Sequence, residues 1–238
     1  MKTSLIHIFV ISGSHLILLD ELFAILRIPF FVRFLILSFY SLVVGWQPPA
    51  VRALSALGLR GLFKSRGWKF PPDLMTMIAG CFTLALFPAW WNSPSLLMSW
   101  CASLALAWAS LLKIKKVFHR LLFNQCAVFI FMCAPLWGLS SLHPLALLYN
   151  LLLGPIVSYI LLPLGFLSVM IPPIVAAFDF VMSAFAHILE WVSEPVPAAS
   201  AKQISISTLW FWIFAWHIFF HSIRLRLRQG KDAAWSGY

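Results

Sequence analysis

The chain has 238 residues, of which 62% are hydrophobic and only 10% are charged, and its formal net charge is +10. A soluble domain has about 25% charged residues, so this surplus of apolar side chains excludes a water-soluble core and predicts a lipid bilayer as the solvent. The basic residues gather between apolar runs, which argues against a soluble nucleic-acid-binding domain.

Apolar runs follow one another along the whole chain, and most reach the roughly 20 residues that a spanning helix needs. They cover residues 4–26, 29–46, 48–63, 73–91, 94–112, 121–139, 144–170, 173–192 and 205–223. The predicted fold is therefore all-α and polytopic, with about 7–9 transmembrane or half-spanning helices in one unit over residues 1–238.

The first run contains the polar stretch HIFVISGSH, residues 7–15. Gly13 lowers helix propensity and the Ser12 hydroxyl competes for backbone groups, so a helix break is expected near Ser12-Gly13. A break at that depth is tolerated if it is buried in protein or lines a polar cavity, and His15 lies on the same face as Ser12 if the helix is intact. The alternative is a tight helix–helix contact at Gly13.

The third run begins with QPPAVRAL, residues 47–54, and is short enough to be a half-span or a re-entrant helix. Two prolines can start a helix, which carries Arg52 into the apolar zone. An arginine there is expected to pair with a carboxylate, a carbonyl end or an anion, or else to extend to the lipid headgroups.

The seventh run, residues 144–170, is longer than one span and is interrupted by helix-breaking residues. These are Gly154, Pro155, Pro163 and Gly165. We expect a kinked or split helix near Gly154-Pro163.

The eighth run carries a polar stripe on an otherwise apolar helix. Its members are Asp179, Ser183, His187 and Glu190. Steps of four, four and three place them on one helical face, which would face a water-filled cavity or lie flat at the membrane surface.

His217 and His221 lie one turn apart beside RLRLR and could bind a metal. No third or fourth ligand accompanies them, so an interfacial helix is the preferred interpretation and no metal or other cofactor is expected. No hydrolase elbow of the GxSxG type accompanies Ser12 and His15, so no catalytic residue is expected and the chain is predicted not to be an enzyme.

Basic residues predict the orientation, because loops rich in Lys and Arg stay in the cytoplasm. If all the runs cross, the clusters around Arg27, Arg60, Lys113 and Arg224 fall on the cytoplasmic side. The C-terminus is then cytoplasmic and the N-terminus outside, in a multi-pass protein of the membrane.

The order of several motifs resembles the ComEC family, the membrane proteins of DNA internalisation in bacterial competence. HIFVISGSH resembles its HxxxISGxH signature through His7, Ile11, Ser12, Gly13 and His15. QPPAVRALSAL resembles a segment of the form SxxVRAxxM, with Arg52 at its arginine, and Gln125 lies near the family's AQ position.

A further block, LHPLALLYNLLLGPIVSYILLPLGFLS, is similar to the family's SPxSLxxNLLxxPLVSxxLPLG. It carries across Asn150, Pro155, Ser158, Pro163 and Gly165. SPSLLMSWCASLALAW stands where the family usually has a GFQLSF segment. Family members also have an OB-like domain and a metallo-β-lactamase-like domain, and neither is expected in this competence-type transmembrane domain.

The resemblance implies an inner-membrane channel, or a channel subunit, that takes single-stranded DNA into a bacterial cell during transformation. Its candidate channel-lining or DNA-contacting residues are Ser12, Gly13, His15, Arg52, Gln125 and Asn150. The implied partners are single-stranded DNA, the lipid bilayer and a separately encoded OB-fold or metallo-β-lactamase-like protein. A cytoplasmic DNA-pulling ATPase is also implied because the chain has no P-loop, and a homodimer is left open.

Two alternatives stay open at the level of sequence. One is a membrane scaffold that recruits partner proteins, and the other is a carrier for a small anion or a lipid.

Overall fold

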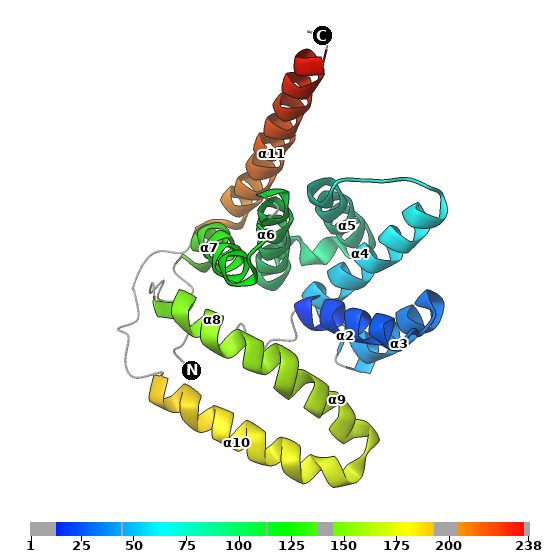
Figure 1. The fold of residues 1–238 in the computed structure, drawn as a ribbon, viewed down its shortest axis with the longest axis vertical. Helices are drawn as coiled ribbons and strands as arrows, with labels where there is room; N and C mark the ends of the chain where they lie inside the picture. The colour runs from blue at the N-terminus through cyan, green and yellow to red at the C-terminus, as the bar shows by residue number, and fades with distance from the viewer. Residues whose placement is uncertain (1–12, 44, 113, 138–144, 193–203, 236–238) are drawn as a thin grey trace.

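The computed structural model describes residues 13–43, 45–112, 114–137, 145–192 and 204–235 (Figure 1). His7, Ile11 and Ser12 lie outside these residues. The first described helix begins at Gly13, so the break expected near Ser12-Gly13 stays a prediction.

The described residues form helices and no strands, which confirms the all-α class. The helices of the first half are α2 (Gly13–Ile25), α3 (Phe30–Val43), α4 (Pro48–Ser65), α5 (Pro72–Leu86), η1 (Pro88–Asn92) and α6 (Pro94–Ala109). Those of the second half are η2 (Ser110–Leu112), α7 (Val117–Leu136), α8 (Leu145–Ile156), η3 (Val157–Leu161), α9 (Leu162–Met170), η4 (Pro172–Ile174), α10 (Val175–Val192) and α11 (Ile206–Trp235).

Prolines start several of these helices. Pro48, Pro72 and Pro94 stand at the first helical position of α4, α5 and α6, where the missing N–H would have no intrahelical partner in any case. At α6, the Ser93 hydroxyl also accepts a hydrogen bond from the Leu96 N–H. The start of α4 at Pro48 confirms the helix expected from QPP.

The interruption expected near Gly154-Pro163 takes the form of a π-helical segment. The chain stays helical from α8 through η3 to α9, and η3 supplies the wider turn. Pro155 removes one backbone hydrogen bond inside the helix, and a local π turn is one way to satisfy the freed groups in a membrane. Gly165 then packs close to α10, where an added Cβ would lie 3.1 Å from the Phe178 ring.

Buried apolar residues form three clusters. The largest joins α6, α7 and α11 around Trp100 and Phe131. A second joins α2, α3 and α4 around Leu16 and Leu54, and a third joins α8, η3 and α10 around Phe185. In Figure 1, α8, α9 and α10 form a hairpin at one side of the molecule, and α11 projects from the other.

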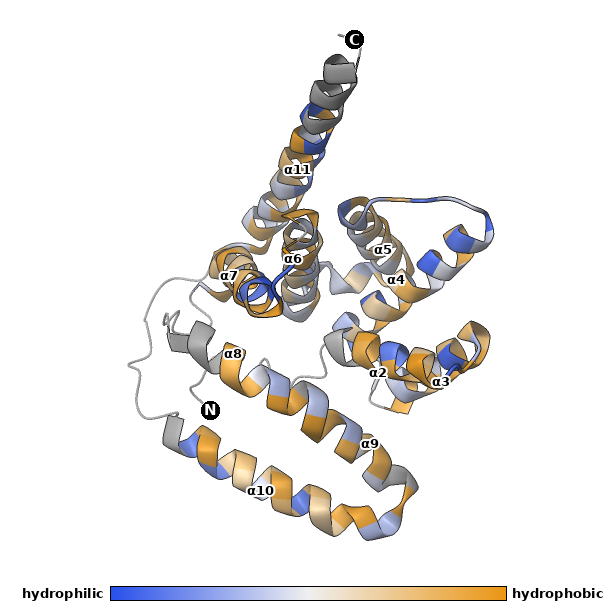
Figure 2. Ribbon diagram, in the orientation of Figure 1, coloured by the Kyte–Doolittle hydropathy of each residue, from blue (hydrophilic) through white to orange (hydrophobic). Residues whose placement is uncertain are grey.

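Five of the described helical segments are long and apolar enough to cross a membrane. They are Pro94–Leu112, Val117–Leu136, Leu151–Ser168, Pro172–Glu190 and Ile206–Arg226. Phe30–Val43 and Pro72–Leu86 are apolar but shorter. Figure 2 shows hydrophobic residues along the length of these helices. Large apolar side chains such as Phe180 and Phe211 are exposed. The protein is therefore a multi-pass membrane protein.

Candidate functional site

The close packing of α2 against α4 brings two of the sequence motifs together. A Cβ added at Gly13 would lie 2.8 Å from the carbonyl oxygen of Pro49 and 3.0 Å from the Cβ of Ala53. Only glycine allows the two backbones to approach so closely. The described part of HIFVISGSH thus meets the QPPAVR segment, and the tight helix–helix contact expected as an alternative at Gly13 is present.

Arg52 projects from α4 into the protein interior, with only 3% of its surface exposed. Its Nε donates to the hydroxyl of Ser99 at 3.0 Å, and its Nη2 donates to the hydroxyl of Ser103. The two serines lie one turn apart on α6, so one guanidinium joins both hydroxyls to α4. The expected extension of Arg52 to the headgroups is wrong, because the side chain is buried and its described partners are neutral hydroxyls rather than a carboxylate or a carbonyl. The expected pairing with an anion stays a prediction.

A second polar contact lies one turn further along α4. Thr83 on α5 is fully buried, and its hydroxyl lies 3.3 Å from the Ser55 hydroxyl and 2.7 Å from the Ala79 carbonyl oxygen. Polar groups in an apolar helical bundle are costly unless they are paired. The junction of α4, α5 and α6 therefore contains a short internal line of polar groups around Arg52.

The two ion pairs found among the described residues lie elsewhere. Arg33 pairs with Asp20 at 3.1 Å between α3 and α2, and Arg224 pairs with Asp73 between α11 and α5. In the part of the chain that the structure describes, Arg52 has no carboxylate partner. Among the described residues it is thus a buried cation whose hydrogen-bond partners are neutral hydroxyls, which is an unusual and costly state.

The remaining lining candidates do not all converge on Arg52. Gln125 is half-buried on α7, and no hydrogen bond joins it to another described residue. His15 lies in the first turns of α2 and Asn150 in α8, but their side chains are outside the described part. Their convergence on one path stays a prediction.

The polar stripe of α10 faces outward over its whole length. Asp179, Ser183, His187 and Glu190 are all exposed in the described chain. The His187 ring Nδ1 lies 2.8 Å from the Ser183 carbonyl oxygen of the same helix. The helical periodicity predicted the shared face, while the choice between a cavity and a membrane surface stays open.

His217 and His221 do not form a pair. His217 is buried and accepts a hydrogen bond from the Trp100 indole N–H at 2.9 Å, whereas His221 is exposed and contacts Arg224. The ring of His217 packs inside the bundle against α6, and the position of the helix relative to the membrane interface stays a prediction. Within the described ranges, no three His, Cys, Asp or Glu side chains group closely enough to hold a metal ion.

Sequence reasoning missed the partners of Arg52. Ser99 and Ser103 lie in SPSLLMSWCASLALAW, a segment noted in the sequence only because it stands where the ComEC family usually has GFQLSF. Their spacing of four residues in an apolar run was the available signal, since it places two hydroxyls on one helical face. It could not show which helix that face would meet.

The sequence model of a known family, described as "Competence protein", matches residues 1–229. Comparison with curated proteins and with solved structures found no match. The match covers nearly the whole chain, including the Gly13 contact, Arg52 and the two serines of α6. The chain therefore belongs to the Competence protein family and corresponds to its transmembrane domain.

Proposed function

We propose that this protein is an inner-membrane channel, or a subunit of one, that passes single-stranded DNA into the cell, and that Arg52 contacts the phosphates of the strand. Membership of the Competence family links the chain to competence and DNA uptake. The observation that carries the proposal is the buried Arg52 guanidinium, held by the hydroxyls of Ser99 and Ser103.

The energetics of a buried guanidinium support an anionic partner. Removing a cation from water costs several kcal/mol of desolvation free energy. A hydrogen bond to a neutral hydroxyl offsets less of this cost than a hydrogen bond to an ionised group does. Arg33 and Arg224 each have a carboxylate partner, whereas no described carboxylate pairs with Arg52. A phosphate would supply the missing charge and would match the planar fork of the guanidinium.

The arrangement of the contacts suggests how a strand could reach Arg52. The guanidinium bridges α4 and α6, so a small separation of these helices would exchange serine hydroxyls for phosphate oxygens. Ser55 and Thr83 lie next to the bridge and would line the opened junction with further hydroxyls. The described state is then the closed one, in which the serines occupy the phosphate position.

The test is uptake of labelled transforming DNA in cells that carry Arg52 variants. Arg52→Gln keeps hydrogen-bond donors for the serines but removes the charge, and we expect uptake to fall by about tenfold or more because one charge-assisted bond contributes about 1.5–3 kcal/mol. Arg52→Lys keeps the charge and should retain a larger share of uptake. Protein in the membrane is quantified in parallel.

The matched control is Lys115→Ala, which removes an exposed cation next to α7 and should leave uptake unchanged. Normal uptake in Arg52→Gln at a normal protein level would contradict the proposal. A carrier for a small anion would instead lose transport of that anion while DNA entry persisted. If the protein is a scaffold, DNA uptake should depend on the recruitment of partner proteins and not on the charge at position 52.

A further inference from the structure

The connection between α4 and α5 folds back on the end of α4 in a glycine-dependent turn. Gly67 has a φ of +73°, the Gly67 N–H donates to the Lys64 carbonyl, and the Trp68 N–H donates to the Phe63 carbonyl at 2.9 Å. This pattern is the Schellman motif, whose usual apolar contact is supplied here by Phe63 and Trp68, with ring centroids 5.8 Å apart. The turn therefore holds Trp68 in a defined place.

Three aromatic rings pack together at this turn. Phe70 lies edge-on to Phe63 at 4.8 Å and to Trp68 at 6.2 Å. The cluster is not a core, because Trp68 remains 57% exposed and Phe70 39% exposed. A firmly held aromatic surface that faces outward is available to stack against a ligand.

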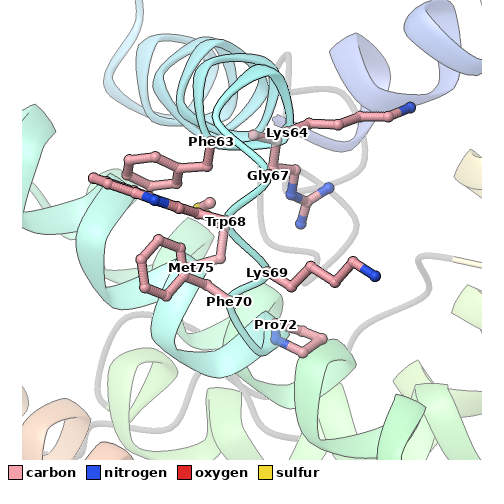
Figure 3. Close-up of a pocket in the computed structure, with 9 residues that line it drawn as sticks. Phe63, Lys64, Gly67, Trp68, Lys69, Phe70, Pro72 and Met75 are labelled. Atoms are coloured by element: carbon pink, nitrogen blue, oxygen red, sulfur yellow. The ribbon is translucent and has the colours of Figure 1, made fainter.

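A pocket of about 490 Å³ opens beside these rings and is also lined by cations. Its charged residues are Arg60, Lys64 and Lys69, and no acidic side chain lines it. Arg60 and Lys64 lie one turn apart on α4. Figure 3 shows the rings of Phe63, Trp68 and Phe70 on one side of the chain and the side chains of Lys64 and Lys69 extending on the other.

The nearest acid along the sequence does not neutralise this pocket. Asp73 is buried and pairs with Arg224 of α11. The pocket therefore keeps three positive charges beside an aromatic surface. Its volume lies within the roughly 300–1,000 Å³ typical of small-ligand sites.

We propose that this pocket binds a nucleotide of single-stranded DNA, with its base against Trp68 and its phosphates at Lys64, Lys69 and Arg60. A nucleotide has a flat π surface at one end and a negative charge at the other, which matches the aromatic and the cationic residues that line the pocket. Aromatic stacking combined with a cationic groove is the general solution for binding single strands without sequence preference. The proposal rests on the proposed function, because it supplies a binding site for the transported strand.

The position of the pocket suits one end of the proposed DNA path through the membrane rather than its centre. The α4–α5 turn lies at the end of the molecule where Arg224 meets Asp73, so two basic clusters share that end. Loops of this charge are cytoplasmic by the positive-inside rule. The site would then hold the strand as it leaves the membrane.

The experiment uses fluorescence anisotropy to measure the binding of a fluorescein-labelled oligo-dT of twelve nucleotides to the full chain in nanodiscs of neutral lipid. Trp68→Ala should weaken binding by about tenfold or more, because one stacked base contributes about 1–3 kcal/mol. Lys64→Ala with Lys69→Ala should weaken binding and lower the slope of log K against log salt by about 0.7 for each cation.

The matched controls are Trp137→Ala, which removes another exposed tryptophan, and Lys115→Ala, which removes another exposed cation. Both should bind as the unaltered chain does. Because Trp68 is exposed, its variant should keep the helical circular dichroism of the unaltered chain, and Trp68→Phe should keep part of the affinity.

Unchanged affinity in Trp68→Ala and in the double lysine variant would overturn the proposal. Displacement of the oligonucleotide by short-chain phosphatidylglycerol but not by an unlabelled strand would also overturn it and would assign the pocket to lipid headgroups. If Arg52→Gln blocks uptake while the pocket variants bind normally, the proposal of a nucleotide site is contradicted and the proposed channel function is supported. If the pocket variants lose binding while Arg52→Gln takes up DNA normally, only the proposed role of Arg52 in the channel is contradicted.

Discussion

Single residues decide how closely the helices approach. At Gly13, the group that an added methyl would meet is the Pro49 carbonyl, a backbone atom that cannot rotate away. At Arg52, two hydroxyls on another helix determine where the guanidinium lies. At His217, the Trp100 N–H determines the direction of the ring. Each residue was noticed in the sequence as a polar or flexible exception, and each is explained by a partner distant in sequence.

Gly13→Ala tests the contact between α2 and α4. The added Cβ would lie 2.8 Å from a carbonyl oxygen, and overpacking of this kind costs about 1–3 kcal/mol. We expect a lower thermal unfolding midpoint in detergent micelles. Gly154→Ala is the matched control, because nothing described lies within 4 Å of its added Cβ and alanine favours a helix. A Gly13→Ala protein as stable as the control would show that the helices can separate freely.

Replacing His217 tests the buried hydrogen bond with Trp100. His217→Leu keeps the volume but leaves the Trp100 N–H without an acceptor, which costs about 1–3 kcal/mol, whereas His187→Leu alters an exposed ring. We expect the first change to lower the unfolding midpoint in micelles and the second to leave it nearly unchanged. Equal midpoints would mean that another group accepts from the indole.

At the scale of elements, composition and periodicity predicted much of the fold. The helical class and the start of α4 at its two prolines follow from the local sequence, without reference to any other segment of the chain. The interruption after Gly154 was predicted, but its π-helical form was not, because that form depends on how neighbouring groups satisfy the backbone. The site was less predictable, since the pairing of Arg52 with Ser99 depends on helix–helix packing, which no single segment encodes.

The ion pair between Asp73 and Arg224 joins two elements 151 residues apart. It fastens α11 to the first turn of α5, and both side chains are largely buried. Breaking one partner leaves an uncompensated charge, so Arg224→Leu should destabilise the protein by roughly 3–5 kcal/mol. Limited proteolysis should then release α11 faster than in the unaltered chain.

The control for that change keeps both charges and exchanges their positions. Asp73→Arg combined with Arg224→Asp should recover part of the protease resistance that either single change removes. If the exchanged protein is as sensitive as the single variants, the attachment of α11 depends on packing rather than on the charge pair.

At the scale of the whole molecule, contacts between α5 and α11 bear on how many segments cross the membrane. The Trp210 indole N–H donates to the Trp91 carbonyl at 2.9 Å near the start of α11, and Arg224 meets Asp73 near the end of its apolar stretch. The 15 residues of α5 rise only about 23 Å, which is less than the thickness of the hydrocarbon core. The longer segment from Asp73 to Trp91, however, is bonded near both ends of the apolar stretch of α11, which is long enough to span the membrane. If α11 crosses, α5 with η1 must cross beside it.

Labelling of single cysteines should therefore place Ser65 and Asn92 on opposite sides of the membrane. In a chain whose four native cysteines are replaced by alanine, Ser65→Cys and Lys115→Cys should react with an impermeant maleimide only in inverted vesicles, because their loops are basic. Asn92→Cys, between η1 and α6, should react only from the outer face. All three sites are exposed, so a missing reaction reports sidedness rather than burial. If all three react from one side, α5 and α6 form a re-entrant hairpin, and the junction that holds Arg52 opens to that side alone.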